Sequence, residues 1–299
     1  MTGPTPSGTD RSDLKRFGAA LDGTTDDTVA VVLMLDACGY AAIPPRTRCR
    51  ISALTLGRQQ ALYLGPGSLL FRSKHDPFTG PMITLSRNHG SVIGDSATLW
   101  SQNASPDGVV RFERAPGFAC EWSRVSGLHI RGPGGNTEAV GIAFFGSPTF
   151  QNRVADVTIS DVTVGVRMSP GANMNQVAHS SLYNIGTAGL DLDGTADATI
   201  GGITVASSPD IIVIRLRGSA QRNSLYGIVA EPGGHSTFMH VDSGCTSNSI
   251  HGVSNTTELG RDEGRGTLVS LPASPRRPER QDGVRQVGES LTTARGEIG

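Results

Sequence analysis

The chain has 299 residues, of which 37% are hydrophobic and 18% charged, and its formal net charge is −1 at pH 7. This balance argues against a general nucleic-acid or anionic-membrane binder, because both need a basic surface. The 39 glycines and 17 prolines indicate many short strands and turns rather than a large helical protein. No run approaches the ~18 apolar residues that a membrane span needs, and no signal peptide is visible at the start. We therefore expect neither nucleic acid nor membrane insertion.

The chain begins with a segment rich in Thr, Gly, Pro and Ser, followed by strong helix signals. Residues 1–15 lack hydrophobic periodicity, which predicts a flexible N-terminal arm. Asp22-Gly23 is a turn dipeptide, and Thr25 or Asp26 is the expected N-cap of a helix through the apolar run 29–35. This helix should extend to about Cys38 and end at Gly39, before a short strand at 41–45 that two prolines close.

The motif F-G-A-x-x-D-G-x-T-D-D-T-x-A, a helix and then I-P-P resemble the entry segment of the pectate lyase and polygalacturonase superfamily, which phage tailspikes share. The resemblance covers residues 16–54 strongly and the remainder only in rhythm. It departs from the family pattern at Arg16, at Leu21 and at 46–49. It implies a cap on a right-handed parallel β-helix, with mostly structural carboxylates. It does not indicate which chemistry lies farther along the stack.

Short apolar or alternating segments, broken by Gly, Pro or Asn, fill the chain after this entry. From Asn152 onward similar units recur every ~21 to 25 residues, which is a solenoid period. Asn152, Asn223 and Asn248 each precede a strand and fit turns between faces. We predict an all-β fold, a single-stranded right-handed parallel β-helix (solenoid) with a short N-terminal capping α-helix. The expected boundaries are an arm at 1–15, a cap at 16–46, the β-helix at 47–271 and a low-order C-terminal tail at 272–299.

The four cysteines are widely scattered and contain no C-x-x-C pair. This spacing favours ordinary buried thiols over a disulfide framework or a zinc site. We therefore expect no metal site from the cysteines.

Two aspartates on one predicted strand are the sharpest candidates for chemistry. Leu190 and Leu192 alternate with Asp191 and Asp193, so the two carboxylates should point outward on one face. Such a pair suits glycoside hydrolysis, or alternatively binds a cation. A structural alternative is also open, because Asp193-Gly194 is a normal turn start.

Glu231 ends a later predicted strand, beside the glycine loop 232–235. Coils of a β-helix are about 4.8 Å apart, so this Glu can come within range of Asp191 and Asp193 as a third catalytic carboxylate. The alternative is a solvated turn residue. His235 lies in the same loop and is a candidate substrate contact.

Two arginines are two residues apart on one predicted strand face. Arg215 and Arg217 can bind an acidic sugar through forked hydrogen bonds, or supply the base of a lyase. Hydrolysis needs no cofactor, whereas a lyase would often use Ca²⁺.

Aromatic rings can hold a glycan, because the C–H face of a sugar packs on a ring. Tyr183 and Tyr226 occupy the same phase in their units, which predicts an outward ladder; partly buried rings at a coil edge are the alternative. Trp100 and Trp122 are further candidate platforms.

Together these patterns predict a phage tailspike-like protein that recognises a bacterial surface polysaccharide. Whether it also cleaves this polysaccharide is left open, with a glycosidase favoured over a lyase. The alternatives are a non-catalytic receptor-binding or structural tail component, and a secreted pectate-lyase-like enzyme. We expect a homotrimer in the virion tail, synthesised in the host cytoplasm, with contacts to other tail proteins through the N-terminal arm. An extracellular location is the alternative.

Overall fold

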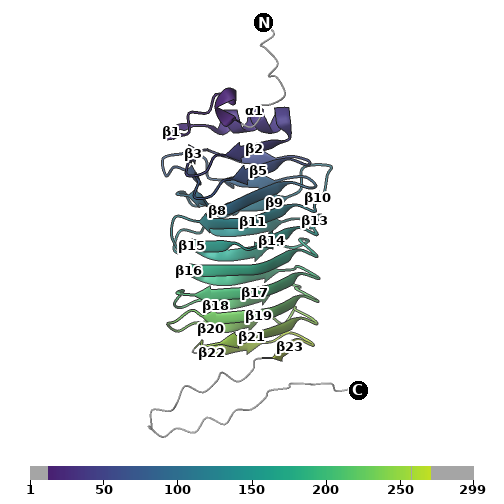
Figure 1. Cartoon of the computed structure of the whole chain (residues 1–299). Helices are drawn as coiled ribbons and strands as arrows, with labels where there is room; N and C mark the ends of the chain where they lie inside the picture. The colour runs from purple at the N-terminus through teal and green to yellow at the C-terminus, as the bar shows by residue number, and fades with distance from the viewer. Residues whose placement is uncertain (1–12, 257, 271–299) are drawn as a thin grey trace, which may run out of the picture.

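The computed structural model describes residues 13–256 and 258–270, and these form a parallel β-solenoid of about 10 turns (Figure 1). Strands account for 53% of the described residues and helix for 6%. The predicted all-β parallel β-helix is therefore confirmed. The C-terminal tail at 272–299 and residues 1–12 of the predicted arm lie outside the described part. None of the described helices is long and apolar enough to cross a membrane.

The N-terminal cap contains η1 (Leu14–Phe17), β1 (Asp22–Asp26) and α1 (Thr28–Cys38), with α1 lying across the end of the stack (Figure 1). As predicted, α1 ends at Gly39, which is left-handed and donates its N–H to the Leu35 carbonyl at 2.8 Å. One side of α1 is buried against the first coil. The helix therefore covers apolar surface that the open end of the solenoid would expose.

The N-cap of α1 is Asp27, not Thr25 or Asp26. The Asp27 carboxylate makes no capping bond and instead accepts from the amides of Ala20 and Leu21 at 2.7 and 3.1 Å. The expected capping bond comes from Asp26, whose Oδ1 accepts from Thr28 N at 2.9 Å. Asp27 thus holds the segment before the helix in place, while the Asp26 carboxylate accepts a free backbone N–H of the first helical turn.

Each coil contributes to three faces, which we number in the order in which the chain meets them from Tyr40 onward. Face 1 comprises β2 (Tyr40–Ile43), β5 (Ala61–Leu64), β14 (Arg153–Ala155), β23 (Leu268–Ser270) and the starts of β8 (Ser91–Ser101), β11 (Arg124–Arg131), β16 (Gln176–Asp193), β17 (Thr199–Ala206), β19 (Ser224–Glu231) and β21 (Ser249–Ser254). Face 2 comprises β1, β3 (Arg48–Arg50), β6 (Leu69–Arg72), the start of β15 (Thr158–Met168), the middle of β16 and the later parts of β8, β11, β17, β19 and β21. Face 3 comprises β4 (Leu54–Leu56), β7 (Ile83–Leu85), β9 (Val110–Glu113), β12 (Val140–Phe145), the ends of β15 and β16, β18 (Ile212–Arg217), β20 (Thr237–Val241) and β22 (Glu258–Asp262). A separate short pair joins β10 (Cys120–Glu121) to β13 (Thr149–Phe150).

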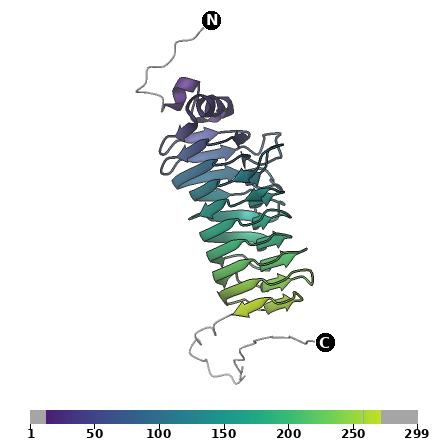
Figure 2. The same cartoon turned by 90° about the vertical axis from the view of Figure 1, so that its right-hand side faces the viewer.

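All these pairs are parallel, so like positions of successive coils lie directly over one another (Figure 2). On face 3, Leu190 lies between Val166 and Ile214, and all three point into the core with no exposed surface. Burying one such side chain stabilises the fold by roughly 1.5–3 kcal/mol. The outward side chains of the same strands form equally regular columns, and these columns carry the polar chemistry.

A buried asparagine ladder lies in the turn before face 1. Asn152 Nδ2 donates to Asn175 Oδ1 at 3.1 Å, and Asn223 Nδ2 donates to Asn248 Oδ1 at 2.9 Å. The predicted turn positions of Asn152, Asn223 and Asn248 are confirmed, and Asn175 is a fourth member.

Cys49, Cys120 and Cys245 are buried thiols, as predicted. Burial raises the pKa of the Cys120 thiol to about 12. A thiol with so high a pKa is unreactive at neutral pH, so its role is packing.

Candidate functional site

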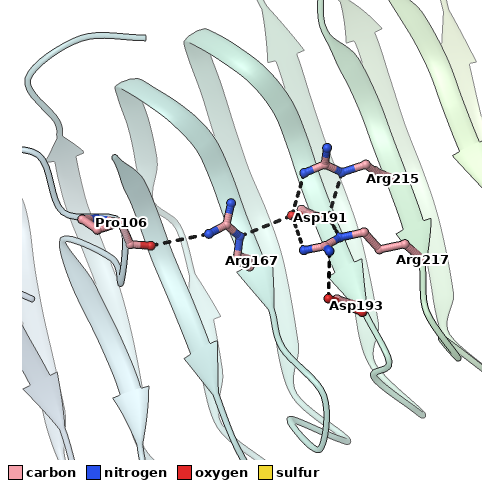
Figure 3. Close-up of polar contacts among 6 residues, drawn as sticks. All are labelled: Pro106, Arg167, Asp191, Asp193, Arg215 and Arg217. Carbon is pink, nitrogen blue, oxygen red and sulfur yellow. Dashed lines mark hydrogen bonds and ion pairs between the residues drawn. The ribbon is translucent and has the colours of Figure 1, made fainter. Parts of the chain in front are cut away.

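A column of charged residues runs along the outside of face 3. Arg167 of β15 lies beside Asp191 of β16, Asp191 beside Arg215 of β18, and Arg215 beside His240 of β20. Neighbouring members are about 4.8 Å apart, the spacing of paired strands. Arg217, two residues after Arg215, reaches back to the same aspartate (Figure 3).

Asp191 is surrounded by three guanidinium groups. Arg215 binds it in a fork, with Nε donating to Oδ1 at 2.9 Å and Nη2 to Oδ2 at 2.8 Å. Arg217 Nε donates to Oδ1 at 3.0 Å, and Arg167 Nε donates to Oδ2 at 3.3 Å. As predicted, Asp191 points outward between buried leucines, but the arginines cover it so fully that its exposed fraction is 0%.

The environment of Asp191 keeps its carboxyl group ionised. Burial alone would raise the pKa, but hydrogen bonds from Arg215 and Arg217 and their positive charges hold it below the ordinary value. A carboxyl group that stays ionised cannot donate a proton as a general acid, and a covered one cannot attack a sugar. Asp191 therefore has no accessible surface in the folded chain, and its catalytic role stays a prediction.

Asp193 lies at the edge of the same group. Its Oδ2 is 2.9 Å from Arg217 Nη1, and its side chain is one quarter exposed. Arg217 therefore bridges Asp191 and Asp193. The pKa of Arg217 is raised, chiefly by its hydrogen bond to Asp191, so the guanidinium is cationic at any working pH. A catalytic role for Asp193 stays a prediction.

Glu231 lies on face 2, at the end of β19, and not on face 3. Its register neighbour is Ala206 of β17, and its Oε1 accepts from Asn255 Nδ2 at 3.3 Å. Residues 232–236 turn the corner before the next face 3 strand begins. The prediction that one groove presents Glu231 with Asp191 and Asp193 is therefore wrong, although Glu231 is exposed and its catalytic role stays a prediction.

The two tyrosines do not form one ladder. Tyr183 lies on face 2 beside Ala206, whereas Tyr226 lies on face 1 beside Gly201. Both are exposed, by 37% and 49%, so each ring can still contact a ligand. The ring of Tyr226 lies so close over Gly201 that a Cβ there would be 2.3 Å from it. The two Leu-Tyr pairs therefore look alike in sequence but lie on different faces of the solenoid.

His235 lies in the corner loop between faces 2 and 3. It is exposed, and its backbone N donates to Asp210 Oδ1 at 2.8 Å, which ties the loop to the coil before it. The structure thus brings together Asp191, Asp193, Arg215 and Arg217, and it places Glu231, His235 and both tyrosines elsewhere.

Arg167 is the member of the site that sequence reasoning missed. It precedes Asp191 by 24 residues, and Asp191 precedes Arg215 by 24. The constant spacing of 24 residues, together with the apolar residues on both sides of each charged one, could have identified Arg167 from the sequence.

We call Arg167, Asp191, Asp193, Arg215 and Arg217 the Asp191 cluster. Its three cations exceed its two anions by one charge, and the arginine side chains are 30%, 25% and 38% exposed. Guanidinium groups bind carboxylates in planar forks, so the cluster can bind an anionic group. Within 13–256 and 258–270, no group of three or more His, Cys, Asp or Glu is placed to hold a metal ion.

No family model and no curated protein sequence matches the chain. Among solved structures it is similar to the enzymatically active domain of tailspike protein 2 of bacteriophage CBA120, with a TM-score of 0.61 and 16% identity over 89% of this chain and 43% of that one. It is also similar to full-length tailspike protein 2 from an Escherichia coli O157:H7 bacteriophage, with a TM-score of 0.52 and 12% identity over 88% of this chain and 42% of that one. The chain thus spans about two fifths of the length of these structures. It has the parallel β-helix fold found in phage tailspike proteins, which confirms the expectation drawn from its entry segment.

Proposed function

We propose that the chain is a phage tailspike-like β-helix that binds an acidic bacterial surface polysaccharide on face 3. The observation that supports this most directly is the Asp191 cluster, in which a buried carboxylate holds three partly exposed arginines. The fold is similar to that of phage tailspike proteins, and this likeness favours a surface glycan as the ligand.

Asp191 gives the cluster its binding chemistry by fixing the arginines in advance. A free arginine loses side-chain rotamer entropy when it binds a ligand, which costs about 0.5–1.5 kcal/mol. Arg215 and Arg217 have already lost this freedom, because each makes two hydrogen bonds to Asp191. A carboxylate arriving from solvent therefore meets cationic donors that are already oriented.

The shape of face 3 suits a polymer better than a small molecule. The column continues from Arg215 to His240 and Arg261 on the following coils. A glycan lying along the stack would meet these side chains at intervals of about 4.8 Å.

The same proposal includes the assembly. A tailspike of this kind would be a homotrimer in the virion tail, with the N-terminal arm contacting other tail proteins. Cleavage of the glycan by Asp193 and Glu231 stays a prediction, as does Ca²⁺ dependence if a lyase reaction occurs. A non-catalytic receptor-binding role would require only that the Asp191 cluster binds the polysaccharide, without cleaving it.

Binding of the full chain to a panel of acidic and neutral bacterial surface polysaccharides tests this proposal. We expect saturable binding to acidic members that weakens as salt rises, because exposed ionic contacts are screened. Arg167→Gln should weaken binding about tenfold or more, since a charge-assisted hydrogen bond contributes roughly 1.5–3 kcal/mol. Arg167 is suited to this test because its one bond to Asp191 is long.

The matched control is Arg222→Gln, which removes an arginine from an exposed pair with Asp197 in the turn before face 1. It should leave binding unchanged. Equal binding to neutral and acidic members, or undiminished binding by Arg167→Gln, would refute the proposal. New reducing ends or unsaturated-uronate absorbance in the same mixtures would reveal cleavage, the latter pointing to the secreted lyase-like alternative.

A further inference from the structure

A pocket of about 350 Å³ lies at the corner between faces 2 and 3, in the coils nearer the cap. It is lined by Lys74, Trp100, Gln102, Arg131 and Asp161, and by residues 132–134. Trp100 and Arg131 are register neighbours on face 2, and Arg131 is followed in the next coil by Ser160. None of these residues belongs to the Asp191 cluster.

The loops at this corner are longer around the pocket than elsewhere. Faces 2 and 3 are joined by residues 73–82, 102–109 and 132–139 in these coils, but only by 207–211 and 232–236 in later ones. Insertions confined to one corner of a repeat protein commonly mark its binding surface. The extra chain here builds the walls of the pocket.

The side chains in the pocket are held in place by their neighbours. Arg131 Nε donates to Asp161 Oδ2 at 2.8 Å, and its guanidinium lies 5.0 Å from the centre of the Trp100 ring. Asp161 Oδ1 accepts from the Asn184 amide, and Gln102 Oε1 accepts from the Lys74 backbone N at 3.1 Å. The polar groups therefore need little rearrangement to meet a ligand.

The chemistry of the lining is that of a sugar site with an excess of positive charge. Trp100 supplies an apolar ring edge, Asp161 can accept from hydroxyl groups, and Gln102 can donate and accept. Lys74 and Arg131 provide two cations against the single Asp161 carboxylate. Lys74 is exposed and the Arg131 side chain is 47% exposed, so both charges can reach a ligand.

The size indicates one unit and not a chain. The volume lies at the lower end of the ~300–1,000 Å³ typical of small-molecule sites. We propose that this pocket binds a single uronic acid unit, presented as a branch or an end of the polysaccharide; the proposal deepens the proposed function and rests on it for the class of ligand. Lys74 binds the sugar carboxylate, Asp161 accepts from ring hydroxyls, and the Trp100–Arg131 pair supports the sugar face.

The sequence provides a direct test, because Lys15 and Lys74 are its only lysines. The full chain is acetylated with and without glucuronate, and modification at each lysine is measured by mass spectrometry. We expect glucuronate to slow acetylation of Lys74 about threefold or more at saturation and to leave Lys15 unchanged. Equal protection of both lysines, or of neither, overturns the proposal.

Fluorescence gives a second readout, because Trp100 and the exposed Trp122 are the only tryptophans. In a Trp122→Phe background, glucuronate should change the emission of Trp100 saturably, and glucose should bind at least about fivefold more weakly. Lys74→Gln should remove this preference, while Lys15→Gln, the matched control, should keep it. Equal responses to the two sugars overturn the proposal.

The Arg167→Gln variant separates this site from the one on face 3. Its response to glucuronate should equal that of the wild type, even where its polysaccharide binding is lost. A glucuronate response without any polysaccharide binding supports the pocket and refutes the proposed function. Polysaccharide binding without a glucuronate response supports the proposed function and refutes the proposed role of the pocket.

Discussion

Asp191 illustrates how the surroundings of a carboxylate determine its use. Its sequence context, an acid between two inward leucines, is the same as that of a solvent-facing catalytic acid. Three arginines from the two neighbouring coils convert it into an orienting anchor. Removing it would leave these arginines without their shared counter-charge.

Replacing this anchor should destabilise the β-helix strongly. We expect Asp191→Asn to lower the free energy of unfolding by about 1–3 kcal/mol, because three partly exposed guanidinium groups lose their charge-assisted hydrogen bonds. Denaturant unfolding followed by circular dichroism measures the change. Asp197→Asn, which breaks the exposed pair with Arg222, should have little effect. Equal stability of wild type and Asp191→Asn would show that the three arginines do not depend on Asp191.

The contribution of Asp191 should also depend on pH. Its pKa in the folded chain is below the unfolded value of about 3.9, so the unfolded chain binds a proton first as pH falls. The stability difference between wild type and Asp191→Asn should therefore be complete above about pH 5 and should shrink as pH falls below about 4. Unfolding measured from pH 3 to 7 tests this; a difference that grows with acidity would contradict the lowered pKa.

Among the elements, the asparagine ladder has an interruption that predicts a stabilising change. Ala198 holds the ladder position between Asn175 and Asn223, and it offers no side-chain acceptor to the coil before it. In the complete steps, one Oδ1 accepts both the N and the Nδ2 of the preceding asparagine. The ladder therefore lacks two hydrogen bonds at this coil.

Filling this position should stabilise the solenoid. We expect Ala198→Asn to raise the free energy of unfolding by roughly 0.5–1.5 kcal/mol for each bond regained. Asn175→Ala should do the opposite, because it removes the acceptor of buried donors on Asn152. Thermal unfolding of both variants measures the two shifts, and a loss of stability in Ala198→Asn would show that this turn has no room for the amide.

At the scale of the whole molecule, each coil contacts mainly its neighbours, so the stack presents independent sites along its length. The pocket and the Asp191 cluster share no residue, although Asp161 of the pocket and Arg167 of the cluster lie on the same strand, β15. Losses from Lys74→Gln and Arg167→Gln should therefore add in free energy for a glycan that reaches both.

The assembly is a prediction of the same scale. We expect the chain to sediment at micromolar concentration with three times its monomer mass, because long exposed β-helix faces favour side-by-side association. Sedimentation velocity measures this directly. A monomer at that concentration would contradict the homotrimer and would leave the binding sites of the single chain as described.

Local sequence determined the elements, because turn chemistry and alternation act within a few residues. The stop at Gly39, the strand Ala61–Leu64 and the coil period follow from left-handed glycine, flanking breakers and inward apolar residues. The parallel β-helix itself was predictable for this reason. The division of roles between Asp26, which makes the capping bond, and Asp27, which accepts from Ala20, was less predictable, since either acid suits the first turn.

Only the tertiary structure decided which side chains meet, because register between coils depends on corner lengths that vary along the chain. Tyr183 and Tyr226 look alike in sequence, yet they lie on faces 2 and 1, and Glu231 lies a corner away from Asp191. Covering Asp191 requires Arg167 and Arg215, each 24 residues away, and the pocket joins loops from three coils. The charge interactions of both sites depend on contacts between residues far apart in the sequence, and a pattern within a few neighbouring residues does not predict such contacts.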